Sequence, residues 1–501
     1  MAAIGFTRRL SLREIVAQLA HDEFMVINAT LFGALRELGW SHGRLVTELN
    51  LVMGPGYVGR STVSEWVNQS RIPRDPLPTV IAHVLTEALG RQISLAQLWQ
   101  GRATVSQLWV ASLAGIEAGW GTEHNQRVIA DWLSRGDEVF DCDRRRFLST
   151  WGTPLAGLGW SYVENLPEGD SDRITAVRPS RRGRAITTSM VSICAETVDR
   201  LRKLDDHEGG NLANIRFAHR YLLAIGQHVH SGDAANSQVA DQLVELWMQL
   251  CQIAGWMAYD AQLHGLAQRY FYSALHASRA LGDTAFGAHA LAHLTHQAIY
   301  CGKSREATEL AHAAVETAKD TSPAQRALVD MLLAHAEALS GNAYGFSTAA
   351  DRAANLMRRS DVYTTAPSWL YWFDDAECMV KRGHALLSLA RVSSGPPAAW
   401  LAQAAELLEP RTSPSDPAFP REAVYNRLWL ARSYLWQSDL ERALATAADT
   451  FGSSIVRSPR CLAQLRELDA ELQAQPRLRD LAVVRRFRSQ AREVVFAQRR
   501  A

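Results

Sequence analysis

Three histidines of this 501-residue sequence have a spacing that could bind a metal ion. His289, His293 and His296 stand at positions i, i+4 and i+7, so a helix would bring them to one face, where imidazoles can share a cation. No carboxylate stands at a matching position to complete such a site, and His312 and His335 follow in neighbouring segments. The pattern therefore favours polar packing between helices, and we expect no metal ion.

A cluster of aromatic and acidic residues is a second candidate site. Its members are Trp369, Tyr371, Trp372, Asp374 and Asp375. If the cluster lined the concave surface of a helical array, it could hold a peptide or a small ligand. An aromatic run at the start of a helix more often belongs to a core, so both interpretations stay open.

The motifs of the common enzyme classes are missing from the sequence. It has no G-x-x-x-x-G-K-[ST] loop for nucleotide phosphates and no G-x-G-x-x-G turn after a strand. It also lacks H-E-x-x-H for a catalytic zinc ion and G-x-S-x-G for a nucleophilic serine. We therefore expect neither enzyme activity nor a cofactor.

The composition is that of a globular protein with nearly balanced charges. Of the residues 47% are hydrophobic and 21% charged, with 53 lysines and arginines against 52 acidic residues. These values exclude wholesale disorder, and the length predicts two or three folded units of about 150 residues each. The 6 cysteines are dispersed without a C-x-x-C pair, as suits a reducing compartment. Since no stretch reaches the roughly 20 apolar residues of a membrane span, we expect a cytoplasmic protein without a membrane partner.

The N-terminal part of the chain predicts a series of short helices. Apolar spacing and capping signals place them at about 11–19, 30–38, 41–49, 60–68 and 79–89. The segment Gly54-Pro55-Gly56 separates the third helix from the fourth, because it cannot continue a helix. Two short helices that flank a turn are the usual framework for placing one helix in the major groove of DNA.

Two runs in this region resemble a known DNA-binding family. ALRELGWSHGRLVTELN and GRSTVSEWVNQSRIPRDPLPTVIAHVLTEALG are similar to the helix-turn-helix of Cro/C1-type (XRE-family) repressors. The similarity is greatest to an actinobacterial subgroup that joins this motif to a tetratricopeptide-like region, and it covers about Thr30 to Trp99. The chain departs from the family in a turn with roughly eight extra residues, as is common in that subgroup. Val46 and Asn50 replace the usual alanine and glycine, which allows a wider crossing of the paired helices.

The resemblance implies which residues contact DNA. In helix-turn-helix proteins the start of the second paired helix faces the base edges, and its free N–H groups also favour phosphates. The residues expected at or beside base edges are Arg60, Ser61, Thr62, Ser64, Glu65 and Asn68. Arg60 would bond guanine and Glu65 would accept from cytosine, while Val63 and Trp66 would face the core. The residues expected at phosphates are Arg44, Arg71 and Arg74.

A different interpretation of the same segment is a small helical bundle without DNA contact. In that interpretation Thr62 and Glu65 form only a capping box. Residues 1–120 contain ten arginines against nine acidic residues, so no large basic surface supports DNA binding there. This weak charge favours the bundle, whereas the motif and the order of elements favour DNA contact.

The rest of the sequence predicts an all-α fold with further parts. Residues 1–120 are the expected helix-turn-helix domain, and the mixed polar sequence of 121–184 is an expected linker region with one or two helices. Residues 185–475 predict a tetratricopeptide-like α-solenoid of alanine-rich helix pairs, in which small residues let the helices approach closely. The turns of these pairs are expected near Asp260, Gly302, Gly341, Gly395 and Ser438, at spacings longer than the roughly 34 residues of a standard repeat. The basic segment 476–501 is expected to cap the solenoid, with nucleic-acid contact and dimerisation as alternatives.

These patterns together lead to two functional expectations. The first is a sequence-specific transcriptional regulator that binds double-stranded DNA as a homodimer, with a solenoid that senses a peptide, small-molecule or protein ligand. The resemblance implies repression of developmental or secondary-metabolism genes. The second expectation is an interaction scaffold whose solenoid binds a protein or peptide and whose N-terminal bundle does not contact DNA.

Overall fold

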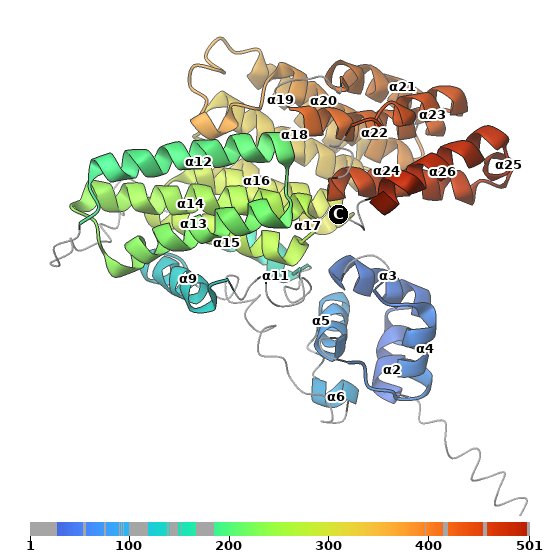
Figure 1. Cartoon of the computed structure of the whole chain (residues 1–501), viewed down its shortest axis with the longest axis horizontal. Helices are drawn as coiled ribbons and strands as arrows, with labels where there is room; N and C mark the ends of the chain where they lie inside the picture. The colour runs from blue at the N-terminus through green and yellow to red at the C-terminus, as the bar shows by residue number, and fades with distance from the viewer. Residues whose placement is uncertain are drawn as a thin grey trace, which may run out of the picture. The chain divides into compact units, whose positions relative to one another are not determined.

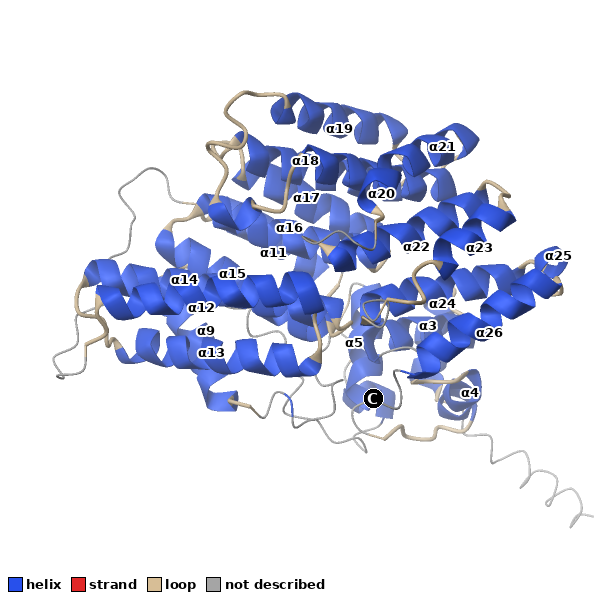
Figure 2. Ribbon diagram, turned by 45° about the horizontal axis from the view of Figure 1, so that its top comes forward, coloured by secondary structure: helices blue, strands red, loops and turns tan. Residues whose placement is uncertain are grey.

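The computed structural model describes most of the chain as helices. The described residues are 28–53, 57–74, 77–89, 91, 93, 95–99, 119–137, 140, 149–151, 153–166, 185–395, 397–413, 419–453 and 458–497. Among them there is no strand, and an isolated parallel bridge between Ile186 and Ala234 is the one β-type pairing (Figure 2). The expected all-α class is confirmed. The chain forms two compact units, Met1–Trp109 and Val110–Ala501.

The first unit contains five described helices. They are α2 (Ala29–Glu37), α3 (His42–Met53), α4 (Arg60–Asn68), α5 (Leu77–Leu89) and α6 (Leu95–Trp99) (Figure 1). Four of the expected helices are confirmed with small shifts at their ends, and the one expected at 11–19 lies outside the described residues. Gly39 ends α2 with a φ of 64°, a left-handed conformation that glycine adopts without a steric penalty.

A single apolar core holds these helices together. Its fully buried members include Leu31 from α2, Leu45 and Leu49 from α3, and Val63 and Val67 from α4. Helix α2 contacts α4, α5 and α6, and α3 contacts α4 and α5. Since every helix buries its apolar stripe against at least one other, the unit has its own core.

The second unit begins with two helices in the region expected to be a linker. Helix α9 (Thr122–Arg135) contacts α13 (Leu212–Ser231) and α15 (His264–Leu281), and α11 (Thr153–Glu164) contacts α17 (Ser304–Thr317). The ring of Trp132 stacks on Tyr270 with centroids 4.6 Å apart, and its indole N–H donates to Ser273 at 2.8 Å. The two helices are therefore part of the second unit, because each buries large aromatic side chains against it.

The remaining helices form consecutive antiparallel pairs. They are α12 (Thr188–Glu208), α13, α14 (Ser237–Asp260), α15, α16 (Thr284–Tyr300), α17, α18 (Pro323–Leu339), α19 (Ala343–Met357), η2 (Ser368–Leu370), α20 (Asp375–Val392), α21 (Pro397–Leu408), η3 (Glu409–Arg411), α22 (Pro420–Trp436), α23 (Leu440–Ala448), α24 (Pro459–Ala474), α25 (Pro476–Arg479) and α26 (Ala482–Ala497). Each expected turn separates two helices, and each helix from α13 to α22 contacts the next along the chain.

A buried ion network joins distant helices of the second unit. The carboxylate of Asp260 is completely buried and lies 2.7 Å from Arg421 and 2.9 Å from Arg460, which are themselves 4% and 1% exposed. Arg421 also donates to the carbonyl oxygen of Asp205 on α12 at 2.8 Å, across 216 residues of sequence. Helix α12 therefore lies against α22, so the series of pairs curves back on its own beginning.

No helix among the described residues is long and apolar enough to cross a membrane.

Candidate nucleic-acid interface

Helix α4 presents one apolar face and one polar face. Val63, Trp66 and Val67 are between 0% and 3% exposed and pack toward α2 and α3. Arg60 and Ser61 lie on the other side and are exposed to solvent. The predicted orientation of Val63 and Trp66 is confirmed, and it directs the first residues of α4 away from the core.

The N-terminus of α4 has no side-chain cap. Gly59 occupies the N-cap position in an extended conformation, and the first turn contains no acidic residue. The first N–H groups of a helix have no partner within the helix, so this end carries a partial positive charge that suits a phosphate or a base oxygen. The capping-box interpretation of Thr62 and Glu65 is wrong, because Thr62 is the third helical residue and Glu65 pairs with Arg71.

The guanidinium of Arg60 crosses the beginning of α3. A Cβ atom placed on Gly43 would lie 2.9 Å from Nη2 of Arg60, so the absence of a side chain at Gly43 makes room for this contact. No carboxylate of the described residues forms an ion pair with Arg60. Its charge is therefore not neutralised within this part of the chain, and the guanidinium can bind an external acceptor.

Asn50 fixes the loop that leads into α4. Its side-chain Nδ2 donates to the carbonyl oxygen of Val58 at 3.1 Å, and its Oδ1 accepts from the backbone N–H of Val58 at 2.8 Å. The two bonds form a closed ring that holds the backbone two residues before the helix. We expected Asn50 only to widen the helix crossing. An amide side chain in place of the usual glycine, just before a long loop, was the available signal for this role.

The other polar residues of α4 bond to their neighbours. Asn68 donates to the hydroxyl of Ser64 at 2.9 Å, and Arg71 donates to Glu65 at 2.7 Å. The Glu65 and Arg71 side chains are 39% and 69% exposed, and such surface ion pairs contribute little to stability. The Glu65 carboxylate can therefore accept from another donor when this pair opens.

The two remaining arginines expected at phosphates differ in their surroundings. Arg44 lies 2.6 Å from Glu48, whose side chain is only 9% exposed, and the Arg44 guanidinium is 5.9 Å from the centre of the Trp40 ring. Arg74 is exposed, and no ion pair to it is found within the described part of the first unit. Arg44 consequently has a structural role as well, because it neutralises a nearly buried carboxylate.

Asn28 connects three helices behind the interface. Its Oδ1 accepts from the N–H of Leu31 at the start of α2, and its Nδ2 donates to the carbonyl oxygen of Leu98 on α6 at 2.9 Å. Its backbone N–H donates to the carbonyl oxygen of Val67 on α4 at 2.8 Å. This residue, which the sequence interpretation missed, therefore positions the last turn of α4.

The aromatic members of the second candidate site have separate partners. Trp369 packs edge-on against Phe286 at a centroid distance of 5.0 Å. The Lys381 ammonium lies 5.2 Å from the centre of the Trp372 ring. Tyr371 is exposed, and its hydroxyl donates to Asp206 on α12 at 2.6 Å.

The acidic members of this cluster also serve local structure. Asp374 caps α20 by accepting from the N–H of Glu377 at 2.8 Å, and it forms an ion pair with Arg411. Asp375 accepts from the hydroxyl of Tyr363 at 2.8 Å. The structure thus places the predicted residues in one segment without directing them to a common partner.

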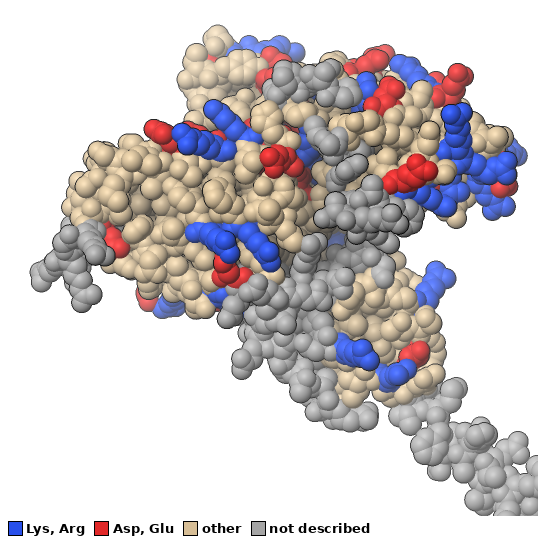
Figure 3. Space-filling model, in the orientation of Figure 1, with Lys and Arg blue, Asp and Glu red and all other residues tan. Residues whose placement is uncertain are grey.

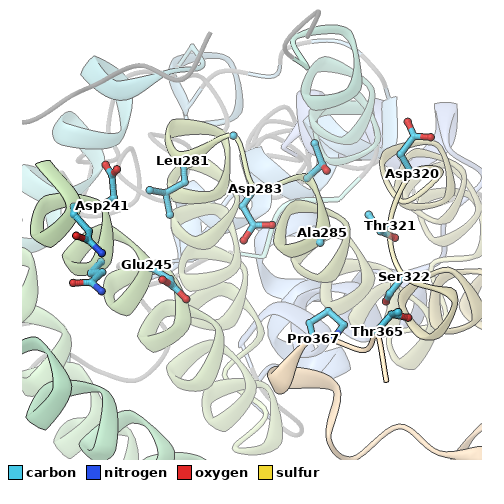
Figure 4. Close-up of a pocket in the computed structure, with 14 residues that line it drawn as sticks. Asp241, Glu245, Leu281, Asp283, Ala285, Asp320, Thr321, Ser322, Thr365 and Pro367 are labelled. Carbon is cyan, nitrogen blue, oxygen red and sulfur yellow. The ribbon is translucent and has the colours of Figure 1, made fainter. Parts of the chain in front are cut away.

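A hollow of about 630 Å³ lies next to that segment (Figure 4). It is lined by Gln238, Asp241, Gln242, Glu245, Leu281, Gly282, Asp283, Thr284, Ala285, Asp320, Thr321, Ser322, Thr365 and Pro367. Four of these residues are acidic and none is basic, and burial raises the pKa of Glu245 and of Asp283. The field in this hollow disfavours an anionic ligand.

The histidines of α16 contact one another and the core. His289 and His293 are 1% and 8% exposed, and their Nε2 atoms lie 3.1 Å apart. The ring of His293 stacks on Phe271 with centroids 5.1 Å apart. No group of three or more potential metal ligands is found among the described residues.

The comparisons with known proteins concern the first unit. Residues 31–98 match the family model described as the SP15 N-terminal domain. This range coincides with the five described helices from α2 to α6. No curated protein and no solved structure matches the chain.

Proposed function

We propose that this protein is a sequence-specific DNA-binding transcriptional regulator whose recognition helix is α4. The observation that carries the proposal is the free N-terminus of this helix. Its apolar side is buried, whereas Arg60 and Ser61 are exposed at an uncapped end without an acidic residue. A helix in this arrangement can enter the major groove with its leading residues against base edges.

The neighbouring helix supports this assignment. The N–H of Arg44 in the first turn of α3 donates to the hydroxyl of Ser41 at 3.2 Å, and the exposed side chains of Arg44 and Thr47 follow on the same helix. In a paired-helix arrangement the first helix crosses the DNA backbone, where arginine and hydroxyl groups contact phosphates. Arg44, Arg71 and Arg74 would then contribute affinity and salt dependence without selecting a sequence.

We infer that the protein acts as a homodimer and that the second unit regulates it. One short recognition helix gives limited affinity, and two half-sites about 34 Å apart would bring two copies of α4 to the same face of DNA. The helix pairs of the second unit offer a large surface for dimerisation and for a ligand or protein partner. Repression of developmental or secondary-metabolism genes is proposed from the family resemblance of the sequence.

The test is selection of bound duplexes from a random DNA library by the full-length protein, followed by sequencing. We expect one enriched motif, and Arg60→Ala should weaken binding to it by about 10- to 100-fold, the range for loss of one bidentate base contact. The matched control is Arg36→Ala, which removes an exposed arginine from α2. An absence of any enriched motif, or an unchanged motif and affinity with Arg60→Ala, would refute the proposal and favour an interaction scaffold.

A further inference from the structure

The last helices of the second unit concentrate positive charge. Within α25 and α26 and the residues between them lie Arg477, Arg479, Arg485, Arg486, Arg488 and Arg492, against Asp480 and Glu493. Lysine and arginine side chains gather at this end of the unit (Figure 3). The whole chain has a formal charge of only +1, so this segment differs strongly from the average of the protein.

Three apolar residues of α26 are buried in packing. Val484, Phe487 and Ala491 are between 0% and 4% exposed, and the ring of Phe487 lies 5.4 Å from that of Phe451. The helix contacts α23 and α24. The expected capping of the helix pairs is thus consistent with the structure, and these three side chains are not free to enter a lipid bilayer.

One arginine fixes the helix, whereas three others point away from it. The guanidinium of Arg488 pairs with Asp469 and donates to Gln473 at 2.9 Å. Arg485, Arg486 and Arg492 are exposed, and no ion pair to them is found within the described residues.

The spacing of the exposed arginines suits an extended anion. Arg485 and Arg492 are seven residues apart, so they lie on the same side of α26 at about 10.5 Å along its axis. Guanidinium groups form bidentate hydrogen bonds with phosphates. The exposed large hydrophobic residues beside them are Leu481 and Val483, and no exposed aromatic anchor of the kind that dominates protein interfaces is found among the described side chains of α25 and α26.

We propose that the exposed arginines of α26 bind the phosphate backbone of double-stranded DNA. These arginines belong to the second unit, whereas α4 belongs to the first, and their contacts add sequence-independent affinity to the proposed base recognition. Because phosphate contacts release condensed counterions, its contribution falls steeply as the salt concentration rises.

The experiment measures binding of the full-length protein to a labelled random-sequence duplex of about 30 base pairs, by fluorescence anisotropy between about 0.05 and 0.25 M salt. The variant Arg485→Gln/Arg486→Gln/Arg492→Gln should lose three phosphate contacts. The magnitude of the slope of log K against the logarithm of the salt concentration should fall by about 2.7, and binding at the lowest salt concentration should weaken by about tenfold or more. The corresponding triple replacement by lysine keeps the charges and should retain the slope.

The control is Arg200→Gln/Lys203→Gln/Arg305→Gln, which removes the same charge from exposed positions elsewhere in the second unit. Equal slopes for the α26 variant and this control would overturn the proposal, as would an absence of duplex binding by the unaltered protein at the lowest salt. Selective capture of an acidic protein, with no change in the DNA slope, would also overturn it. The variant Arg60→Ala distinguishes this proposal from the proposed function of α4. It should alter the motif that is selected from the random library. The effect of the α26 replacements on binding to random-sequence DNA should be the same with and without Arg60→Ala.

Discussion

The side-chain amide of Asn50 bonds both backbone groups of Val58, so one residue at the end of α3 determines where the chain enters α4. Between them the sequence has Gly54-Pro55-Gly56, a composition that disfavours a continuous helix. The direction of α4 therefore depends on a half-buried side chain outside the residues proposed to contact DNA.

Replacement of Asn50 should reduce DNA binding without touching the interface. Asn50→Ala removes two partly buried hydrogen bonds, so the free energy of unfolding should fall by about 1–3 kcal/mol. Asn50→Asp retains only the acceptor and should have a smaller effect. Chemical denaturation and binding to the selected duplex measure the two outcomes. Glu37→Gln, which removes the exposed ion pair of α2 with Arg91, is the control, and equal losses for the variants at positions 50 and 37 would contradict the role of Asn50.

A methyl group at Gly43 should redirect Arg60. A Cβ atom at position 43 would lie 2.9 Å from the guanidinium of Arg60. Because the guanidinium is the flexible end of a side chain, Arg60 can move away at little cost in free energy. We expect Gly43→Ala to leave the melting temperature unchanged or to raise it slightly, since alanine favours a helix over glycine. The base preference should change at the position that Arg60 contacts, as measured by repeating the selection. An unchanged preference would show that the observed position of Arg60 is not the one used on DNA.

Neutralisation of Asp260 should destabilise the second unit strongly. Asp260→Asn removes the carboxylate that Arg421 and Arg460 share, and breaking such a buried network costs about 3–5 kcal/mol. Thermal unfolding followed by tryptophan fluorescence measures the change. Asp361→Asn, at a surface pair with Arg359, is the control and should leave the unfolding transition in place. A small effect at Asp260 would mean that neighbouring groups replace the lost charge.

Stability should decrease in mild acid because histidines are buried in neutral form. Burial lowers the pKa of His289 to about 3, whereas the unfolded chain binds this proton near pH 6.5. Between these values the unfolded state binds more protons, so the stability present above pH 6.5 is lost as the pH falls toward 3. At pH 5 the loss from His289 is about 2 kcal/mol. Asp205 acts in the opposite direction, since burial raises its pKa to about 7.

The contribution of His289 is isolated by comparing the pH dependence of denaturant unfolding in the unaltered protein and in His289→Asn. The free energy of unfolding of the variant should decrease less steeply between pH 6.5 and 4. The difference between the two slopes should correspond to at most one bound proton. The same replacement at the exposed His207 is the control for the loss of a surface imidazole. Identical pH profiles for the unaltered protein and His289→Asn would refute the explanation.

The attachment of α11 to the second unit can be tested at Gly287. A Cβ atom there would lie 2.0 Å from the hydroxyl oxygen of Tyr162, which is hydrogen-bonded to Ser278 at 3.0 Å. Gly287→Ala should therefore displace α11 and cost about 1–3 kcal/mol, with earlier proteolysis within Thr153–Glu164. Tyr162→Phe removes only the hydroxyl and should cost about 1 kcal/mol. If Gly287→Ala left proteolysis unchanged, the contact between α11 and α16 would not hold this segment.

The sequence by itself determined the helices and the buried side of α4. Apolar residues at helical spacing bury one face of a helix wherever it packs, so Val63 and Trp66 could be assigned to the core from local pattern alone. The turns at Gly302 and Gly341 were equally local, because glycine tolerates the left-handed backbone found there.

Only the tertiary structure decided how these elements meet. The ring between Asn50 and Val58, and the contact of Arg421 with Asp205, depend on backbone paths that helical periodicity does not encode. The aromatic residues near Trp369 likewise have partners on several helices, although they are neighbours in sequence. The physical reason is that periodicity specifies which face of a helix is buried, whereas the partner of each polar side chain is set by long-range packing.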